Sequence, residues 1–101
     1  MENPLPHDRL DETIHQRTRL AIMASLAAVD ALDFNELKVL LALTDGNLST
    51  HLTALEKAGY VTIVKTFRGK KPNTSVRITR QGRAALAEYV ELLRQILEPK
   101  Q

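Results

Sequence analysis

The chain has 101 residues, of which 44% are hydrophobic and 4% aromatic, so it has room for one domain with a modest, mainly aliphatic core. It contains no cysteine, which excludes disulfides, thiolate metal sites and cysteine nucleophiles. The formal net charge of +2 is unevenly distributed, because no acid interrupts the basic residues Lys65, Arg68, Lys70, Lys71, Arg77, Arg80 and Arg83. A basic block of this kind is typical of a surface that meets phosphates.

The N-terminal residues 1–7 include Pro4 and Pro6 and have no periodic pattern, which predicts a flexible tail. They lack the basic start and apolar run of a secretory leader, and no apolar stretch is long enough to cross a bilayer. We therefore expect a cytoplasmic protein without membrane contact.

A long first helix is predicted from about Asp8 to Ala28, with Asp11 and Glu12 near its N-terminus, where the helix dipole favours acids. One apolar stripe contains Ile14, Ile22 and Leu26, and a second contains Leu20, Met23 and Ala27. Two apolar faces predict two partners, the core of the domain and a second copy of the chain.

A short second helix is expected to run to Leu43. Asp33 and Glu36 have the spacing of a capping box, which fixes the start of this helix. Its buried face is predicted to consist of Phe34, Leu37, Leu40 and Leu41.

The third helix, residues 45–58, has Thr44 as its predicted N-cap and Gly59 as its stop. Its large apolar residues Leu48, Leu52 and Leu55 recur on one face, which leaves a small and polar outer face. Short hydroxyl and amide side chains can approach base edges closely. This helix is therefore predicted to be a recognition helix, and with the preceding short helix it forms a helix-turn-helix.

A β-hairpin is predicted after Gly59, with strands 60–67 and 74–78 around a turn at 68–73. A final helix, capped by Thr79, is expected to reach Leu97 and to stop before Pro99. Gly82 near its start predicts a close approach to another backbone segment, because a helical glycine costs about 1 kcal/mol relative to alanine. The apolar stripe of this helix continues beyond what a small core can cover, which again predicts a dimer.

The chain resembles the winged-helix transcriptional regulators of bacteria, in the MarR-like and ArsR-like group. The resemblance lies in Leu43 to Leu52 and Leu55 to Tyr60 for the helix-turn-helix, in Phe67 to Pro72 for the wing, and in Ile78 to Arg83 for the start of the next helix. It implies a mainly α fold with a small β-hairpin and long terminal helices, in one DNA-binding and dimerisation domain over residues 8–98. It also implies a homodimer that uses the first and last helices.

The predicted function is a sequence-specific transcriptional regulator that binds double-stranded DNA, with helix 45–58 in the major groove and the basic wing 65–77 on the flanking backbone or minor groove. The expected base contacts are Gly46, Asn47, Ser49, Thr50, His51 and Thr53. The expected backbone contacts are Lys57, Lys65, Arg68, Lys70, Lys71 and Arg77. The expected dimer contacts are Leu20, Met23, Ala27, Leu86, Tyr89, Leu93 and Ile96.

Two positions leave alternatives open. Asn47 is the best candidate for reading a base, because its amide can pair with adenine twice. His51 either contacts DNA at the helix edge or packs partly buried on the first helix. Asp45 departs from a favourable surface, because an acid near DNA repels phosphate unless it stabilises the helix start or accepts from a cytosine.

Other functions compete with DNA binding. A winged-helix module that binds an acidic protein partner, without a DNA role, is the alternative. An enzyme is disfavoured, since no acid-base or nucleophilic constellation is visible. Asp11 and His15 alone do not make a metal site, no Gly-rich cofactor loop is present, and no polar cluster identifies a small-molecule effector.

Overall fold

The computed structural model describes residues 4–98 and places them in helices around one small sheet. The elements in chain order are η1 (Pro6–Arg9, a 3-10 helix), α1 (Arg17–Ala27), β1 (Leu32–Asp33), α2 (Phe34–Leu40), α3 (Asp45–Lys57), β2 (Val61–Arg68), β3 (Lys71–Ile78) and α4 (Arg80–Leu97). The antiparallel sheet has the order β1-β3-β2. The predicted mainly α fold with a β-hairpin, a winged helix-turn-helix, is confirmed.

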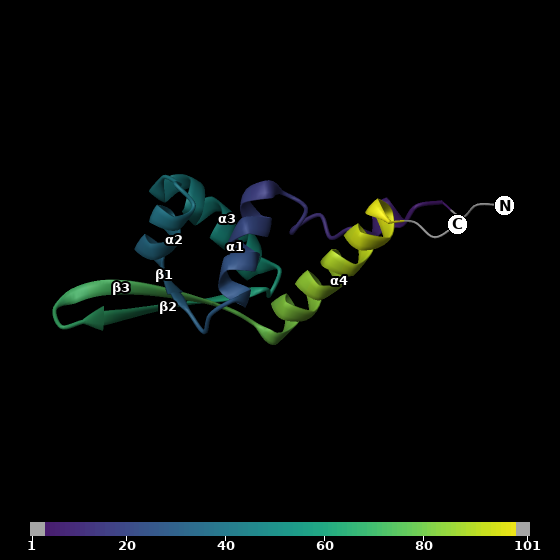
Figure 1. Ribbon diagram of the computed structural model, residues 1–101. Helices are drawn as coiled ribbons and strands as arrows, with labels where there is room; N and C mark the ends of the chain where they lie inside the picture. The colour runs from purple at the N-terminus through teal and green to yellow at the C-terminus, as the bar shows by residue number, and fades with distance from the viewer. Residues whose placement is uncertain (1–3, 99–101) are drawn as a thin grey trace.

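The molecule is elongated, with extents of 64 × 25 × 21 Å. Helices α1, α2 and α3 pack on one side of the sheet, while the β2–β3 hairpin extends past them at one end (Figure 1). The helix α4 projects from the opposite end, beside η1. The wing and the C-terminal helix therefore lie at the two ends of the molecule.

The core is formed where α1 meets α3, α4 and β3. Its members are aliphatic side chains together with one methionine and one tyrosine: Ile14, Ile22, Met23, Leu26, Leu37, Leu48, Leu52, Leu55, Val61, Val76, Ile78 and Tyr89. Helix α1 contacts α3, α4 and β3, so Ile22, Met23 and Leu26 are fully buried, whereas Leu20 and Ala27 of its second stripe are only half-buried. The contact between two copies along this stripe therefore stays a prediction.

The start of the first helix was also predicted wrongly, because α1 begins at Arg17 rather than near Asp8. The Asp11 carboxylate accepts hydrogen bonds from the amides of Thr13 and Ile14, at 2.8 and 3.2 Å, and so offers the backbone a turn in place of a helix. The Gln16 side chain then caps α1 by accepting from the Arg19 amide.

Two tyrosines hold the segment between η1 and α1 against the body of the domain. The Tyr60 hydroxyl donates to the Asp11 carboxylate, and the Tyr89 hydroxyl lies 2.7 Å from His15 Nδ1. The hydrogen bond to Asp11, with burial and the carboxylate charge, raises the pKa of Tyr60 to about 12. Asp11 and His15 are thus engaged by different tyrosines, and residues 4–98 contain no cluster of three metal-ligating side chains.

The second helix has the predicted capping box at Asp33 and Glu36, which is confirmed. It ends at Leu40, earlier than predicted, and Ala42 follows with a positive φ of 53°. Leu37 is fully buried, as expected, but Leu40 is exposed. Leu40, the last residue of α2, lies on the solvent side of the helix, so its predicted burial was wrong.

The hairpin is longer than predicted, because β3 begins at Lys71 instead of residue 74. The tight turn contains only Gly69, with a φ of 62°, and Lys70, so Arg68 pairs with Lys71 and Phe67 with Pro72. Both strands are therefore regular almost to the tip of the wing.

Gly82 of α4 lies against the backbone of Tyr60, as the sequence predicted. A Cβ added at Gly82 would stand 2.2 Å from the Tyr60 carbonyl oxygen. The same junction is held by Thr79, whose hydroxyl donates to the Gly59 carbonyl at 2.7 Å and accepts from the Gly82 amide at 2.9 Å. The contact fixes α4 to the base of the wing.

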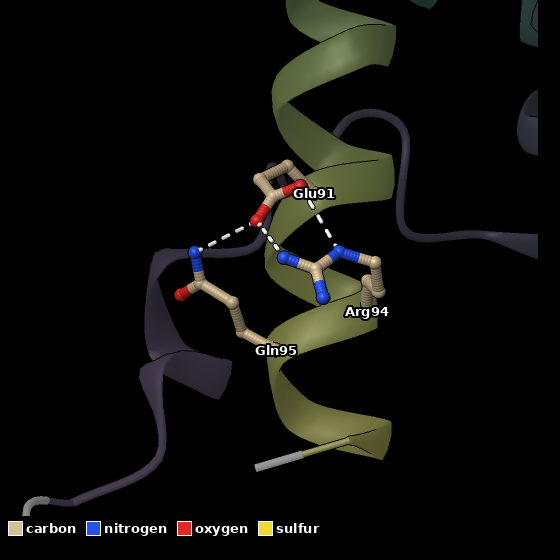
Figure 2. A network of polar contacts seen from close by, with 3 residues as sticks. All are labelled: Glu91, Arg94 and Gln95. Atoms are coloured by element: carbon tan, nitrogen blue, oxygen red, sulfur yellow. Dashed lines mark hydrogen bonds and ion pairs between the residues drawn. The ribbon is translucent and has the colours of Figure 1, made fainter. Parts of the chain in front are cut away.

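The outer surface of α4 carries a polar network of three residues (Figure 2). Arg94 donates to both carboxylate oxygens of Glu91, at 3.2 and 2.6 Å, and Gln95 donates to the same carboxylate at 3.1 Å. The hydrogen bond from Arg94, followed by that from Gln95, lowers the pKa of Glu91.

The helix α4 ends at Leu97, and Pro99 lies outside the described residues. In the described part of the chain, no helix is long and apolar enough to cross a membrane.

Candidate nucleic-acid interface

The outer face of α3 is small, polar and open to solvent. Its exposed residues are Gly46, Asn47, Ser49, Thr50 and Thr53, all predicted base contacts. Thr44 caps the helix as predicted, since its hydroxyl accepts from the Asn47 amide at 3.1 Å. Among the described residues nothing is hydrogen-bonded to the Asn47 side chain. Its donor and acceptor are therefore both free for a partner.

The two threonines of this face use their hydroxyl protons within the helix. Thr50 donates to the Gly46 carbonyl and Thr53 to the Ser49 carbonyl, each at 2.9 Å. These bonds fix the side chains, so the groups that remain for a partner are the hydroxyl lone pairs and the methyl groups. A threonine methyl is suited to contact with the methyl group of thymine.

His51 is half-buried and faces the first helix. Its Nδ1 lies 3.3 Å from the Arg19 guanidinium, which can only donate, so Nδ1 accepts and the proton of the neutral ring lies on Nε2. Burial, and then the charge of Arg19, lowers the pKa of His51. Of the two alternatives left open by the sequence, this geometry favours packing on the first helix. Arg19 also donates to the Thr13 carbonyl and so helps to fix α1.

The acid at the start of α3 is paired. Asp45 lies 2.8 Å from the Lys38 ammonium of α2, and it also occupies the first turn of its helix, where the dipole favours a negative charge. The repulsion of phosphate that the sequence suggested at Asp45 is thus reduced by a cation from the neighbouring helix. Sequence reasoning missed Lys38, because a residue pair across the turn has no periodic signal.

The predicted backbone contacts Lys57, Lys65, Lys70, Lys71 and Arg77 are all exposed. Arg68 differs from them, because its guanidinium lies 2.9 Å from the carboxylate of Asp33 in β1. The Asn73 amide donates to the same carboxylate at 3.3 Å. Asp33 thus joins the start of α2 to the wing. This acid is remote in sequence, and the prediction of a wing without a neutralising acid did not include it.

Helix α3 and the β2–β3 hairpin enclose a shallow pocket of about 670 Å³. Ser49, Thr53 and Glu56 line it from α3, while Lys65 and Thr74 line it from the hairpin; Phe34, Leu52 and Ile63 form the rest. The pocket brings residues predicted to read bases next to a residue predicted to hold a phosphate.

The predicted dimer contacts fall into two groups. Met23 and Tyr89 belong to the core of the single chain, with exposed fractions of 0% and 3%, so we do not retain them as contacts between copies. Leu20, Ala27, Leu86, Leu93 and Ile96 are half-buried. Val90 and Leu97, which the prediction did not include, are exposed by 55% and 70%.

Two exposed and two half-buried apolar residues of α4 fall on one line of the helix. Leu86, Val90, Leu93 and Leu97 alternate steps of four and three residues, which is the spacing of a helix-helix seam. Tyr89 and Leu92 lie on the neighbouring face, toward the core. The seam of Leu86, Val90, Leu93 and Leu97 is hereafter called the α4 seam.

Residues 18–97 match a family model described as a winged helix DNA-binding domain. In sequence, the chain is 40% identical over 72 residues to an uncharacterized protein of Methanocaldococcus jannaschii, covering 71% of this chain and 78% of that protein.

Solved structures share the fold. A transcriptional regulator homologue from Pyrococcus horikoshii has a TM-score of 0.85 and 28% identity, with 93% of both chains covered. A MarR family transcriptional regulator from Silicibacter pomeroyi has a TM-score of 0.63 and 22% identity over 82% of this chain and 55% of the other. The resemblance to small winged-helix regulators is confirmed.

Proposed function

Because the chain belongs to the family of winged helix DNA-binding domains, we propose that it is a sequence-specific regulator of transcription that binds double-stranded DNA as a homodimer. Residues 8–98 form the DNA-binding and dimerisation domain. Helix α3 enters the major groove and the wing holds the flanking DNA. The bacterial regulators that the sequence resembles act on a chromosome that lies in the cytoplasm. We propose that this protein is cytoplasmic as well.

The observation that carries this proposal is the arrangement of two kinds of side chain around one pocket. Ser49 and Thr53, short exposed polar side chains of α3, stand on one wall beside Glu56, and Lys65 of the hairpin stands on the other. Bases are read through hydrogen bonds and methyl contacts, whereas phosphates are held by cations. The surface therefore offers groups of both kinds.

Selection of bound sequences from random duplexes tests the proposal directly. We expect enrichment of a two-fold symmetric site whose half-sites lie about one helical turn apart, bound more weakly as salt rises. A DNA role is contradicted if no duplex is enriched and the remaining binding of duplex DNA does not depend on salt. Capture of an acidic protein by the same preparation then favours the alternative, a protein-binding module.

Substitution Asn47→Ala is expected to weaken binding to the selected duplex by about 1 to 3 kcal/mol, because alanine cannot make the bidentate hydrogen bonds to adenine. Binding to random duplex should change little, since phosphate contacts remain. Titration of both duplexes measures the two effects.

Ser49→Ala serves as the matched control for Asn47→Ala, because it removes an exposed polar group of the same helix face whose one oxygen cannot make the bidentate contact of an amide. Equal losses on the selected and the random duplex would show that Asn47 does not read a base.

The homodimer is proposed from the α4 seam, because this seam holds the most exposed apolar residues of the two terminal helices. Exposed Val90 and Leu97, flanked by half-buried Leu86 and Leu93, leave an apolar stripe at the end of the molecule away from the wing (Figure 1). Two such stripes can bury each other in an isologous contact, which fits a palindromic DNA site. No polar cluster in the described residues identifies a small-molecule effector.

Charge in the α4 seam is expected to dissociate the dimer. Val90→Glu places a carboxylate in the apolar stripe, and because Val90 is exposed the fold of each copy should be unaffected. Sedimentation at micromolar concentration should show a dimer for the wild type and a monomer for the variant. Ala84→Glu, an exposed position on the opposite side of α4, is the control and should stay dimeric. A monomeric wild type would remove the basis for a symmetric site.

A further inference from the structure

The wing carries an aromatic side chain that residues 4–98 leave largely uncovered. Phe67, near the tip of β2, is 72% exposed, whereas the other aromatic residues, Phe34, Tyr60 and Tyr89, are half-buried or buried. Its partner across the strands is Pro72, another exposed apolar side chain. An uncovered apolar pair at the end of a hairpin contributes little to the fold, because it excludes little water there.

The pleat of the hairpin decides which way this pair faces. Successive residues of a strand alternate between the two faces, so Phe67 lies on the same face as Ile63 and Lys65. Ile63 and Lys65 line the pocket beside α3. Arg68 lies on the other face, where Asp33 holds it. The pair of Phe67 and Pro72 therefore extends the wall of the pocket outward along the wing, on the side of the recognition helix.

The charges around the pair decide what can cover it. Lys65 lies on the face of the pair and Lys70 in the turn beside it, while Lys71, the cross-strand partner of Arg68, lies on the other face. No acid occurs in the sequence from Lys65 to Arg83. Two copies of this tip repel each other, so a second wing does not fit. A polyanion can cover the pair. Duplex DNA is a polyanion that also presents an apolar surface between its phosphates, because deoxyribose carbons line the walls of its minor groove.

We propose that Phe67, supported by Pro72, packs against the deoxyribose wall of the minor groove beside the half-site that α3 reads. This inference rests on the proposed function and adds to it an apolar contact between the wing and DNA. The lysines hold the phosphates on either side, while Phe67 contributes affinity that salt does not screen.

A fluorescent reporter at position 67 tests the contact. The chain contains no tryptophan, so Phe67→Trp introduces a single indole at the proposed contact. On addition of the selected duplex its emission maximum should move to shorter wavelength, because water is displaced from the ring. Val64→Trp is the matched control, since Val64 is an exposed apolar residue of the same strand on the opposite face. Its emission should stay unchanged.

Salt dependence separates the apolar contact from the charges. Phe67→Ala should weaken binding about tenfold at every salt concentration, with the slope of log affinity against log salt unchanged. Lys70→Ala should instead flatten that slope by roughly 0.9 for each wing. Hydroxyl-radical cleavage of the sugars flanking each half-site should be suppressed by the wild type and restored in the Phe67→Ala complex.

The outcomes distinguish this inference from the function on which it rests. A wild type that binds no duplex overturns both. A wild type that binds the selected duplex, with unchanged emission from Phe67→Trp and unchanged affinity of Phe67→Ala, overturns the Phe67 contact alone. A weaker affinity of Phe67→Ala that comes with a flatter salt slope also overturns it, since the residue then acts by positioning the neighbouring cations.

Discussion

Substitution Gly82→Ala is expected to lower the free energy of unfolding by about 3 kcal/mol, because the backbone around this residue leaves no room for a side chain. The added Cβ would lie 2.2 Å from the Tyr60 carbonyl oxygen and 2.9 Å from Ile78 Cγ1. A backbone carbonyl cannot turn aside as a flexible side chain can. Relief requires α4 to move away from the base of the wing, which also strains the bonds that Thr79 makes there.

Urea unfolding followed by circular dichroism measures this destabilisation. Gly46→Ala is the control in the same chain, since no atom lies within 4 Å of the Cβ that it adds to α3. Alanine is the better helix former, so this variant should be unchanged or more stable by up to about 1 kcal/mol. Equal stability of the two variants would show that the contact between Gly82 and Tyr60 yields without cost.

Removal of the two lysines at the wing tip is expected to cause the largest decrease in DNA binding. Eliminating one phosphate contact flattens the plot of log affinity against log salt by roughly 0.9, so Lys70→Ala with Lys71→Ala should flatten it by about 3.6 in a dimer with two wings. Both side chains are exposed, and their removal should change the stability of the fold by less than about 0.5 kcal/mol.

Arg68 should behave differently from these lysines, because its guanidinium is already paired with Asp33. We expect Arg68→Ala to change the salt slope less than either lysine substitution does. Arg9→Ala with Arg94→Ala is the control for net charge, since it removes one cation from η1 and one from α4. These two elements contact each other, and α4 projects from the end of the molecule away from the wing (Figure 1). Filter binding across a salt series measures the slope of log affinity against log salt, and thermal melting measures the stability of each variant. An unchanged slope for the double lysine variant with an intact fold would mean that the tip points away from DNA.

The sequence alone was enough to predict the winged-helix fold, the capped recognition helix and the close contact at Gly82. These features depend on local chemistry: Thr44 accepts from the amide of Asn47 three residues later, and the leucines of α3 recur on one face. Gly82 was informative because a glycine inside a helix is unfavourable unless a neighbour requires it.

The tertiary structure decided which side chains meet across the chain. Asp33 was recognised as a helix cap, but only the pairing of β1 with β3 brings it to Arg68 and Asn73. Whether an apolar stripe is covered likewise depends on neighbours, because Ile22, Met23 and Leu26 of α1 are buried by their own chain whereas Val90 and Leu97 of α4 remain exposed. Local patterns specify which elements form and which faces are apolar. Which partner covers each face is settled by long-range packing, and this has no periodic signal in the sequence.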